Sequence, residues 1–337
     1  MRHLVRVLLT IMPLWSLLAA EPAAGKRPPL PAFKQPLLFD TPAADALLPR
    51  LQLFPPDSAW HEDISGRPVH PDSAAMIRRI GADKHLAWNL DMAFIIVPAE
   101  QPRVAVKLTD YADESDDGPY PVPDQAPIEG WPLDGGTLEH VQGVGDGDRH
   151  LIVLDPFHGQ LWEFYHGRRT ATGWQAAGVA LFDLTSNHLR PAGWTSSDAA
   201  GLPILPAVVR YDECARGVID HALRFTVKVS RKEYIYPATH HAGSTSERTA
   251  PAMGQRFRLK AEVKTEAFPP HARAIANALK RYGMLVADNG GDWRISVAPD
   301  RRITGLEALR GLTGADFEVV QTTAEHEGPR APGAPRH

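Results

Sequence analysis

The sequence predicts a mainly β protein, an antiparallel β-sandwich or jelly-roll with two or three accessory helices. Segments with the pattern of strands outnumber those with the pattern of helices, and several alternate apolar and polar residues as half-buried strands do. The chain contains 31 Pro and 27 Gly residues, which favours short strands and shaped turns over long helices. The alternating strand and helix rhythm of a doubly wound sheet is missing.

The first half of the domain is predicted to contain one short helix and several strands. The helix follows Pro71, Asp72 and Ser73, which have the pattern of an N-terminal cap, and it ends at Gly81. A turn at residues 156–159 joins two of the strands as a hairpin. The predicted strands cover residues 88–97, 103–108, 150–155, 161–165 and 178–184.

The second half contains the two segments with the clearest strand pattern. In residues 221–229, and again in 254–263, apolar residues alternate with mainly cationic ones. A helix is expected from Pro269 to Gly283, because Pro is favoured at the start of helices and Gly just after their end. Further strands are predicted over residues 284–288, 293–297 and 317–320, and a short helix over 305–312.

The ends of the chain are expected to lie outside the folded domain. Arg2 and Arg6 precede an apolar run over residues 7–18 and then small residues, which is the pattern of a secretory signal peptide. A membrane anchor is the alternative, but the run is short for a bilayer span. The expected organisation is a signal peptide at 1–20, a Pro-rich leader at 21–56, a single β-rich domain at 57–322 and a disordered tail at 323–337.

Charge and cysteine content narrow the class of protein. Residues 1–20 contain two Arg and no acid, so their removal changes the formal net charge from −4 to −6. A mildly acidic protein is a poor binder of nucleic acid, whose phosphates need clustered positive charge. Cys214 is the only cysteine, and we expect it to be a small buried residue. We expect a monomer that is secreted, extracellular or periplasmic, without a stable membrane span.

An acidic, Pro-rich segment over residues 109–130 is one candidate ion site. Its carboxylates could hold a Ca²⁺ ion, which binds six to eight oxygen ligands, although their spacing is not that of an EF-hand. A solvated acidic loop is the alternative. The carboxylates concerned are Asp110, Asp113, Glu114, Asp116 and Asp117.

No short motif with a known mechanism occurs in the chain, which lacks a Gly-rich phosphate loop, HExxH, CxxC and GxSxG. Catalysis is therefore sought among carboxylates at strand ends and turns, because glycoside cleavage needs two carboxyl groups facing one bond. A cap, turn or ion-pair role is the alternative for each of them, and Asp198 has the setting of a helix cap. The candidates are Asp91, Glu129, Asp148, Asp198, Asp212, Glu213 and Asp288.

A second candidate site is cationic. If the two clearest strands are neighbours, their basic residues form a stripe that could bind an anionic glycan, and a solvated sheet face is the alternative. A lyase acting on a uronate polymer would use Arg224 or Arg256 to neutralise the carboxylate and Tyr236 or His240 as the base. No metal site is predicted, because the adjacent His240 and His241 would point to opposite faces of a strand. The stripe comprises Arg224, Lys228, Arg256, Arg258 and Lys260.

Residues 181–213 combine an apolar run, two Pro-punctuated turns and many polar side chains, so we expect the site to lie there. The expected rim consists of Trp194, Asp198, Arg210, Asp212 and Glu213, with Asp91, Asp148, His150 and the strand of Arg224 nearby.

Several long motifs resemble those of a family of secreted bacterial proteins. The motifs are DMAFIIVP, DESDDGPYPVP followed by PIEG, SNHLRPAGWTSSDAAGLPILPAVVRYDE, HALRFTV, MGQRFRLKA and LKRYGMLVADNG, and the resemblance spans residues 50–322. The family carries no assigned activity, so the resemblance implies no residue roles. Some members resemble fusions to carbohydrate-binding or Ig-like modules, which implies work on extracellular glycans.

The sequence thus predicts a secreted carbohydrate-active protein, either a hydrolase or a lyase of an extracellular polysaccharide. The competing hypothesis is a non-catalytic glycan-binding or cell-envelope structural protein that uses the same face. An enzyme should bring two carboxyl groups to about 5–9.5 Å from each other, the separation that glycosidases use. A binder should show a flat aromatic platform without such a pair.

Overall fold

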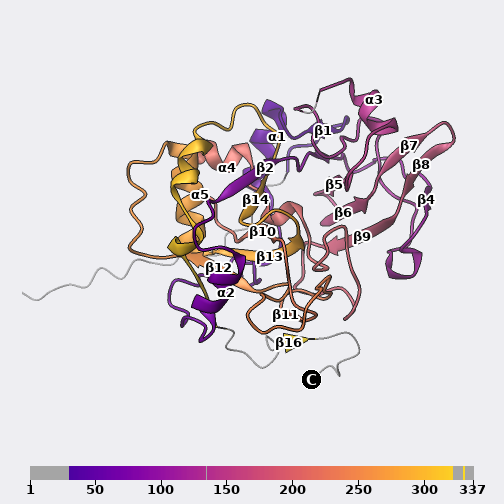
Figure 1. Cartoon of the computed structure of the whole chain (residues 1–337). Coiled ribbons are helices and arrows are strands. Elements are labelled where there is room, and N and C mark those ends of the chain that lie inside the picture. Colours follow the sequence, from indigo (N-terminus) through magenta and orange to yellow (C-terminus); the bar gives the residue numbers. More distant parts are fainter. Residues whose placement is uncertain (1–29, 134, 322–328, 331–337) are drawn as a thin grey trace, which may run out of the picture.

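The computed structural model describes residues 30–133, 135–321 and 329–330, and two large β-sheets organise this part of the chain (Figure 1). The first sheet has five strands, in the order β1 (Leu37–Leu38), β3 (Phe94–Ile96), β5 (Leu151–Asp155), β6 (Gln160–Tyr165) and β9 (Gly178–Asp183). The second has six, in the order β15 (Phe317–Val319), β12 (Arg256–Leu259), β13 (Met284–Asn289), β10 (Leu223–Val227), β14 (Arg294–Val297) and β2 (Ala87–Leu90).

The prediction of an antiparallel sandwich or jelly-roll is wrong, because both large sheets mix parallel and antiparallel strands. β3 runs parallel to β5, β10 parallel to β13, and β14 parallel to β2. Apolar and polar residues alternate in the same way in parallel and in antiparallel strands. Alternation therefore indicates that one face of a strand is buried, and it does not indicate the direction of the neighbouring strand. Direction follows from the connections: β10 is joined to β13 through β12 and the helix α5 (Pro270–Arg281).

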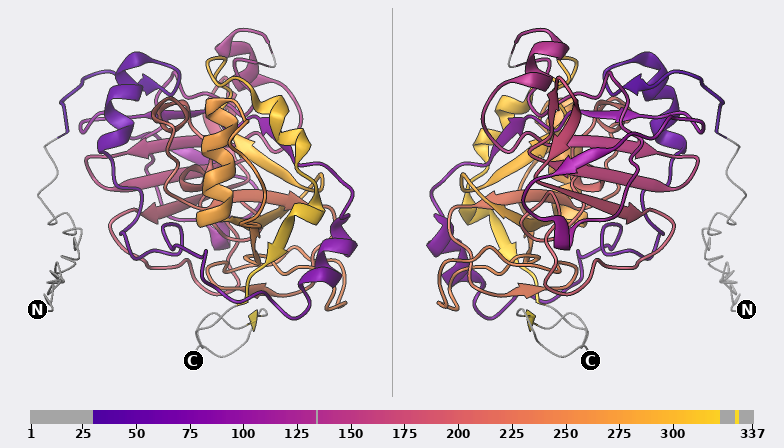
Figure 2. Two further views of the ribbon diagram at one scale, coloured as in Figure 1. Left: turned by 90° about the vertical axis from the view of Figure 1, so that its left-hand side faces the viewer. Right: turned by 90° about the vertical axis from the view of Figure 1, so that its right-hand side faces the viewer.

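Smaller elements complete the fold. A three-stranded sheet has the order β4 (Val106–Leu108), β8 (Gly173–Ala176) and β7 (Arg168–Thr170), and β11 (Tyr234–Ile235) pairs with β16 (Pro329–Arg330). The helix α5 lies across the outer face of the six-stranded sheet (Figure 2). The other α-helices described are α1 (Pro42–Leu47), α2 (Ser73–Ile80), α3 (Leu138–Gly143) and α4 (Tyr211–Arg216). Single 3-10 segments are η1 (Leu48–Arg50), η2 (Ala112–Glu114), η3 (Leu205–Ala207), η4 (Leu306–Gly311) and η5 (Gly314–Asp316).

One continuous apolar core joins the two large sheets. It includes Phe94 and Ile152 from the five-stranded sheet and Phe225 and Leu285 from the six-stranded sheet. A second apolar cluster lies between the other face of the five-stranded sheet and the three-stranded sheet. The five-stranded sheet is therefore covered on both faces, and this explains why residues 151–154 are continuously apolar instead of alternating.

Several local predictions are confirmed. The helix predicted to end at Gly81 is α2, the helix predicted from Pro269 to Gly283 is α5, and β5 and β6 form the predicted hairpin. Cys214 is buried, as expected. Residues 37–50 of the predicted leader form β1, α1 and η1. The predicted signal peptide, and the predicted tail apart from residues 329–330, lie outside the described residues. Among those described, no helix has both the length and the apolar character needed to cross a membrane.

The segment predicted as one strand over residues 88–97 is in fact two strands of different sheets. β2 ends at Leu90 in the six-stranded sheet, and β3 begins at Phe94 in the five-stranded sheet. Between them the Ala93 amide donates a hydrogen bond to the Asp91 carbonyl at 2.8 Å, which bends the chain. Asp91 thus lies where the chain crosses from one large sheet to the other.

Candidate functional site

A polar cluster with Arg224 at its centre is built from residues of both large sheets and the loops beside them. The guanidinium of Arg224 donates to the carboxylate of Asp198 from Nε at 3.1 Å and from Nη2 at 3.0 Å. Its Nη1 donates to Ser296 Oγ at 2.6 Å. The side chains of Arg224 and Asp198 are 3% and 0% exposed, respectively. The centre of the cluster is therefore a fully buried, bidentate ion pair.

Further carboxylic acids surround this ion pair. Asp91 follows β2, Asp288 lies near the end of β13, and Asp148 and Glu129 are brought to the start of β5. The Glu129 amide donates to the His150 carbonyl at 2.9 Å, and the His150 amide donates to Glu129 Oε2 at 3.2 Å. The amide of the residue after Glu129 donates to the Asp91 carbonyl at 2.8 Å. These backbone bonds bring Glu129 beside Asp91.

Burial and mutual repulsion raise the pKa values of two of these carboxyl groups. Desolvation, followed by the charge of Glu129, raises the pKa of Asp91 to about 7. Desolvation, followed by the charge of Asp198, raises the pKa of Asp288 to about 7. The positive charge of Arg224 lowers both pKa values but does not cancel the increase. Asp91 and Asp288 therefore exchange protons near neutral pH, as groups with acid or base roles must.

His150 lies in the same cluster as a neutral ring. Burial, followed by the positive charge of Arg224, lowers its pKa to about 4. Its Nδ1 and the Oδ1 atom of Asp91 are buried, and neither has a hydrogen-bond partner within the described part of the chain. Tyr165, at the end of β6, donates to Asp148 Oδ1 at 3.5 Å, and Asp148 is exposed. The cluster therefore extends from the buried ion pair to the surface.

Asp198 is held in place by the turn around it and by the five-stranded sheet. Its amide donates to Ser196 Oγ at 2.9 Å, but no helix follows, so Asp198 is the ion-pair partner of Arg224 and not a helix cap. Glu163 of β6 accepts hydrogen bonds from the amides of Ile204 and Leu205 at 2.9 Å. Desolvation raises the pKa of Glu163 to about 8, although these two amides act against the increase.

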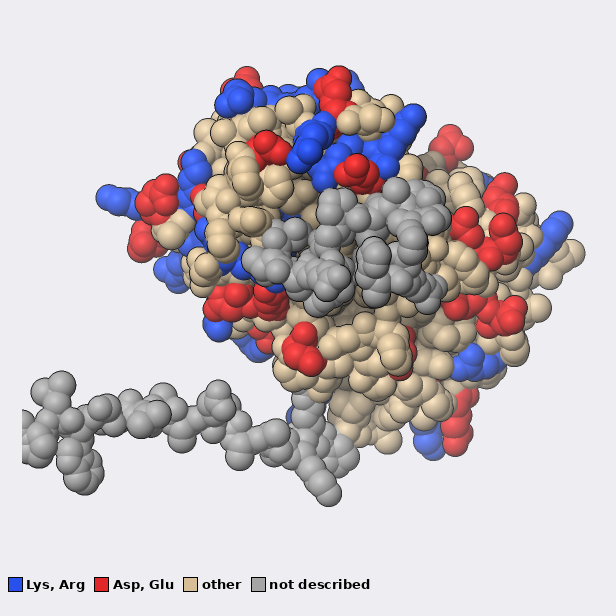
Figure 3. Space-filling view, turned by 90° about the horizontal axis from the view of Figure 1, so that it is seen from below, with Lys and Arg blue, Asp and Glu red and all other residues tan. Residues whose placement is uncertain are grey.

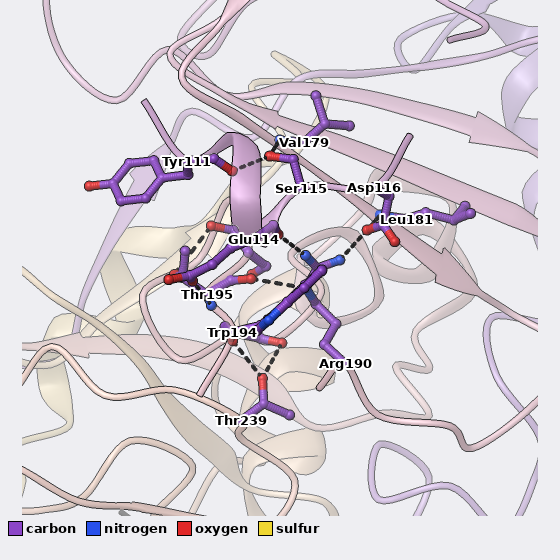
Figure 4. A network of polar contacts seen from close by, with 12 residues as sticks. Tyr111, Glu114, Ser115, Asp116, Val179, Leu181, Arg190, Trp194, Thr195 and Thr239 are labelled. Atoms are coloured by element: carbon purple, nitrogen blue, oxygen red, sulfur yellow. Dashed lines mark hydrogen bonds and ion pairs between the residues drawn. The ribbon is translucent and has the colours of Figure 1, made fainter. Parts of the chain in front are cut away.

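Arg190 ties the same segment to the acidic loop (Figure 4). Its guanidinium pairs with the carboxylate of Asp116 and donates to the carbonyls of Glu114 at 2.6 Å and Thr195 at 2.9 Å. Glu114 Oε2 accepts a hydrogen bond from the Thr195 amide at 2.7 Å. The guanidinium also lies 5.5 Å from the ring centroid of Trp194, which explains the position of this predicted rim residue.

Two of the carboxylates proposed as calcium ligands, Glu114 and Asp116, therefore join one loop to another. In the part of the chain that the structure describes, no three His, Cys, Asp or Glu side chains form a group that could hold a metal ion.

Three predicted site residues form a separate buried group at α4, so the single predicted rim does not exist. Arg210 Nη2 donates to Glu213 Oε1 at 2.5 Å and approaches Asp212, and His221 Nε2 lies 3.0 Å from the same Glu213 oxygen. Burial opposes ionisation of Glu213, but the charges and hydrogen bonds of Arg210 and His221 together outweigh it and lower the pKa. The group borders a cavity of about 300 Å³ that His61 also lines. These acids are thus engaged in ion pairs at α4.

The predicted basic stripe does not form, because β13 lies between β10 and β12. Arg256 donates to the Tyr282 carbonyl at 2.9 Å and to Glu62 at 3.2 Å, and Arg258 pairs with Glu318 at 2.7 Å. These basic residues hold segments of the fold together.

The two predicted lyase bases lie on the segment after β11. His240 donates from Nδ1 to the Ala199 carbonyl at 2.7 Å, so it adjoins the turn that carries Asp198. Tyr236 instead borders a small pocket together with Trp60 and Arg190.

The structure thus brings together Asp91, Asp148, His150, Asp198 and Arg224 of the predicted site residues, and adds the candidate carboxylates Glu129 and Asp288. Sequence reasoning missed Glu163, Tyr165 and Ser296. Glu163 could have been recognised from the sequence, because it is a lone acid within the apolar segment LWEFY of a predicted hairpin, and a buried acid needs a partner.

The pH dependence of stability tests the pKa of Asp91. A carboxyl group with a raised pKa contributes most to stability below its ordinary pKa of 3.8, and this contribution is lost as the pH rises through about 7. Asp91→Asn should therefore be more stable than the wild type at pH 8 by up to about 4 kcal/mol, the free energy that corresponds to an increase of the pKa from 3.8 to about 7. The difference should shrink by more than half at pH 5. Urea unfolding at both pH values measures it, with the exposed Asp83→Asn as control. An equal difference at both pH values would contradict the assigned pKa.

No family model, curated protein or solved structure matches the chain. The resemblance to secreted bacterial proteins remains a prediction. The protein belongs to the class with two mixed β-sheets, and a cluster of titratable residues lies where these sheets meet.

Proposed function

We propose that the protein is a secreted hydrolase that cleaves a glycosidic bond in an extracellular or cell-envelope polysaccharide. The observation that carries the proposal is the pair of carboxyl groups with pKa values of about 7, Asp91 and Asp288, in a cluster that reaches the surface at Asp148. Glycoside hydrolysis needs one carboxylic acid to protonate the leaving oxygen and one carboxylate to act as base or nucleophile.

Asp91 is the proposed general acid. Its high pKa keeps a large fraction of the group protonated near neutral pH, and its Oδ1 atom has no partner among the described residues. In the proposed reaction this carboxyl group faces the oxygen of the leaving sugar. As the bond to the anomeric carbon breaks, Asp91 transfers its proton to the leaving oxygen and becomes a carboxylate, which Arg224 stabilises.

Asp148 is the proposed base. It is exposed, it interacts electrostatically with Asp288, and Tyr165 approaches its Oδ1. A water molecule beside this carboxylate gives up a proton to it as the water oxygen attacks the anomeric carbon. Asp288, whose pKa is about 7, is partly protonated near neutral pH, so it adds less negative charge beside Asp148 than an ionised carboxylate would.

The lyase hypothesis has less support, because its two candidate cations, Arg224 and Arg256, are already bound to other residues. All three guanidinium nitrogens of Arg224 already donate to Asp198 or Ser296, and the buried ion pair with Asp198 already balances its charge. Arg256 is held by the Tyr282 carbonyl and by Glu62.

Activity measurements on matched variants test the proposal. Asp91→Asn and Asp148→Asn should each lower kcat/KM by about 10²- to 10⁴-fold, the usual contribution of a general acid or base. Asp146→Asn is the matched control, because Asp146 is an exposed acid two residues from Asp148 in the same loop. Activity is the release of saturated oligosaccharides from a polysaccharide panel, separated by mass.

Two outcomes would contradict the hydrolase proposal. Unsaturated ends that absorb in the ultraviolet would establish a lyase. Binding of polysaccharides without any product would favour the non-catalytic glycan-binding protein.

A further inference from the structure

Three aromatic rings gather at the surface beside Asp148. The ring of Tyr165 is centred 6.2 Å from that of Tyr111 and 5.8 Å from that of His166. Tyr111 is 44% exposed, His166 is also exposed, and Tyr165 is half-buried. The Tyr165 hydroxyl donates to the Oδ1 atom of Asp148 at 3.5 Å. Aromatic rings and a carboxylate that solvent reaches therefore adjoin one another.

Tyr111 is held firmly through its backbone. Its amide donates to the Ala177 carbonyl at 2.8 Å, and its carbonyl accepts from Ser115 Oγ at 2.6 Å. Gly178 leaves room for this approach, because a Cβ atom on Gly178 would lie 3.2 Å from the Cβ atom of Tyr111. Figure 4 shows the ring of Tyr111 pointing away from the polar network of Arg190. Tyr111 is thus anchored to β9 while its ring remains accessible.

The backbone that carries Asp148 and Tyr165 is strained. Arg149 and His166, the residues that directly follow them, have φ angles of +52° and +57°, which are uncommon for residues other than glycine. The His166 amide donates to the Asp148 carbonyl at 2.9 Å, and the next amide donates to the Arg149 carbonyl at 3.0 Å. Strained residues of this kind cluster at functional sites, where surrounding contacts hold them. Here they fix Asp148 beside Tyr165.

The shape and polarity of these groups fit a sugar ring better than a highly charged polymer. On the face shown in Figure 3, outside the grey atoms, Lys and Arg side chains lie beside Asp and Glu, so that face favours neither a polyanion nor a polycation. A pyranose ring has an apolar face of C–H groups and hydroxyl groups along its edge. The apolar face matches an exposed aromatic ring, and the hydroxyl groups match a carboxylate, which accepts hydrogen bonds.

We infer that Tyr111 and Tyr165 form a subsite for a neutral pyranose unit of the glycan, an inference that rests on the proposed hydrolase function. The ring of Tyr111 stacks on the C–H face of the sugar, and the Asp148 carboxylate accepts hydrogen bonds from its hydroxyl groups. Burial, followed by the charge of Asp148, raises the pKa of Tyr165, so this phenol keeps its proton and remains a donor to the carboxylate. The subsite holds the glycan chain next to the proposed base.

Saturation-transfer NMR with neutral hexasaccharides of glucose, N-acetylglucosamine and mannose tests the inference. Every protein in the titration carries Asp91→Asn, so that the ligand is not consumed. At least one hexasaccharide should bind, and irradiation of the tyrosine ring protons should saturate its C–H protons. Tyr111→Leu should weaken this binding about fivefold or more, whereas Tyr111→Phe, which keeps the ring, should stay within about twofold. Val144→Ser removes an apolar side chain of similar exposure, 46%, and should also stay within about twofold.

The outcomes separate this inference from the proposed function, because mass spectrometry of each hexasaccharide after incubation with the protein that retains Asp91 reports cleavage independently. Binding that Tyr111→Leu leaves unchanged would overturn the inference even if cleavage occurs, and so would a lack of binding by all three hexasaccharides. A loss in Tyr111→Phe or Val144→Ser as large as that in Tyr111→Leu would also overturn it, since the aromatic ring would not be the contact. Binding that depends on Tyr111 but leads to no cleavage would support the subsite and contradict the hydrolase.

Discussion

Arg224→Met is expected to lose about 3–5 kcal/mol of its free energy of unfolding, the usual result of breaking a buried ion pair. The substitution leaves the Asp198 carboxylate, whose side chain is 0% exposed, without its two charge-assisted hydrogen bonds and leaves Ser296 without its donor. Burial already raises the pKa of Asp198 in the wild type, so without Arg224 this carboxyl would take up a proton on folding. Urea unfolding at pH 7 measures the loss.

Two further variants make this result interpretable. Lys228→Met removes a cation from an exposed position just beyond the same strand and should change stability by less than about 0.5 kcal/mol. The double variant Arg224→Met with Asp198→Leu replaces the whole ion pair by apolar groups and should recover most of the lost stability. A double variant as unstable as the single one would show that the pair does more than balance two buried charges.

Gly201→Ala is expected to destabilise the protein by about 3 kcal/mol or more, because strain and steric overlap act together. Gly201 has a φ of +70°, and a Cβ atom there would lie 2.1 Å from Thr239 Oγ1 and 2.7 Å from the Trp194 carbonyl oxygen. The backbone in this region cannot move freely, since the Gly201 amide donates to the Asp198 carbonyl at 2.9 Å. Thermal unfolding measures the loss.

Gly193→Ala is the matched control for this substitution. Gly193 has a φ of +90°, but a Cβ atom there meets nothing within 4 Å, so only the conformational cost of about 1–2 kcal/mol remains. Equal losses of stability in the two variants would mean that Thr239 and the Trp194 carbonyl move away to accommodate the added methyl group.

The elements of the fold were more predictable from the sequence than their arrangement. The helix stop at Gly81, the Pro269 start of α5 and the hairpin of β5 and β6 depend on local chemistry, so the sequence indicates them correctly. Strand partners depend on contacts between distant segments. The basic stripe required the two clearest strands to be neighbours, but the later segment β13 lies between them.

The candidate site could be predicted only in part, because it too depends on contacts between distant segments. The position of acids at strand ends led to Asp91, Asp148 and Asp198, but it could not separate these residues from Asp212 and Glu213. Asp212 and Glu213 stand next to Arg210 in the chain and are paired with it, whereas Arg224 reaches Asp198 only through the fold. Local sequence density around residues 181–213 therefore combined two groups that the structure keeps apart.

The crossing of the chain at Asp91 has a mechanical consequence. Residues 91–93 form the short joint between β2 and β3, so the proposed acid is fixed to the seam between the two large sheets. Its proposed partner Asp148 precedes β5 of one sheet, and Arg224 belongs to β10 of the other. The distance from Arg224 to the two proposed catalytic acids thus depends on the apolar layer between the sheets, because Asp91 and Asp148 precede the neighbouring strands β3 and β5. Side chains of that layer, such as Phe94 and Ile152, therefore influence the site without touching a sugar.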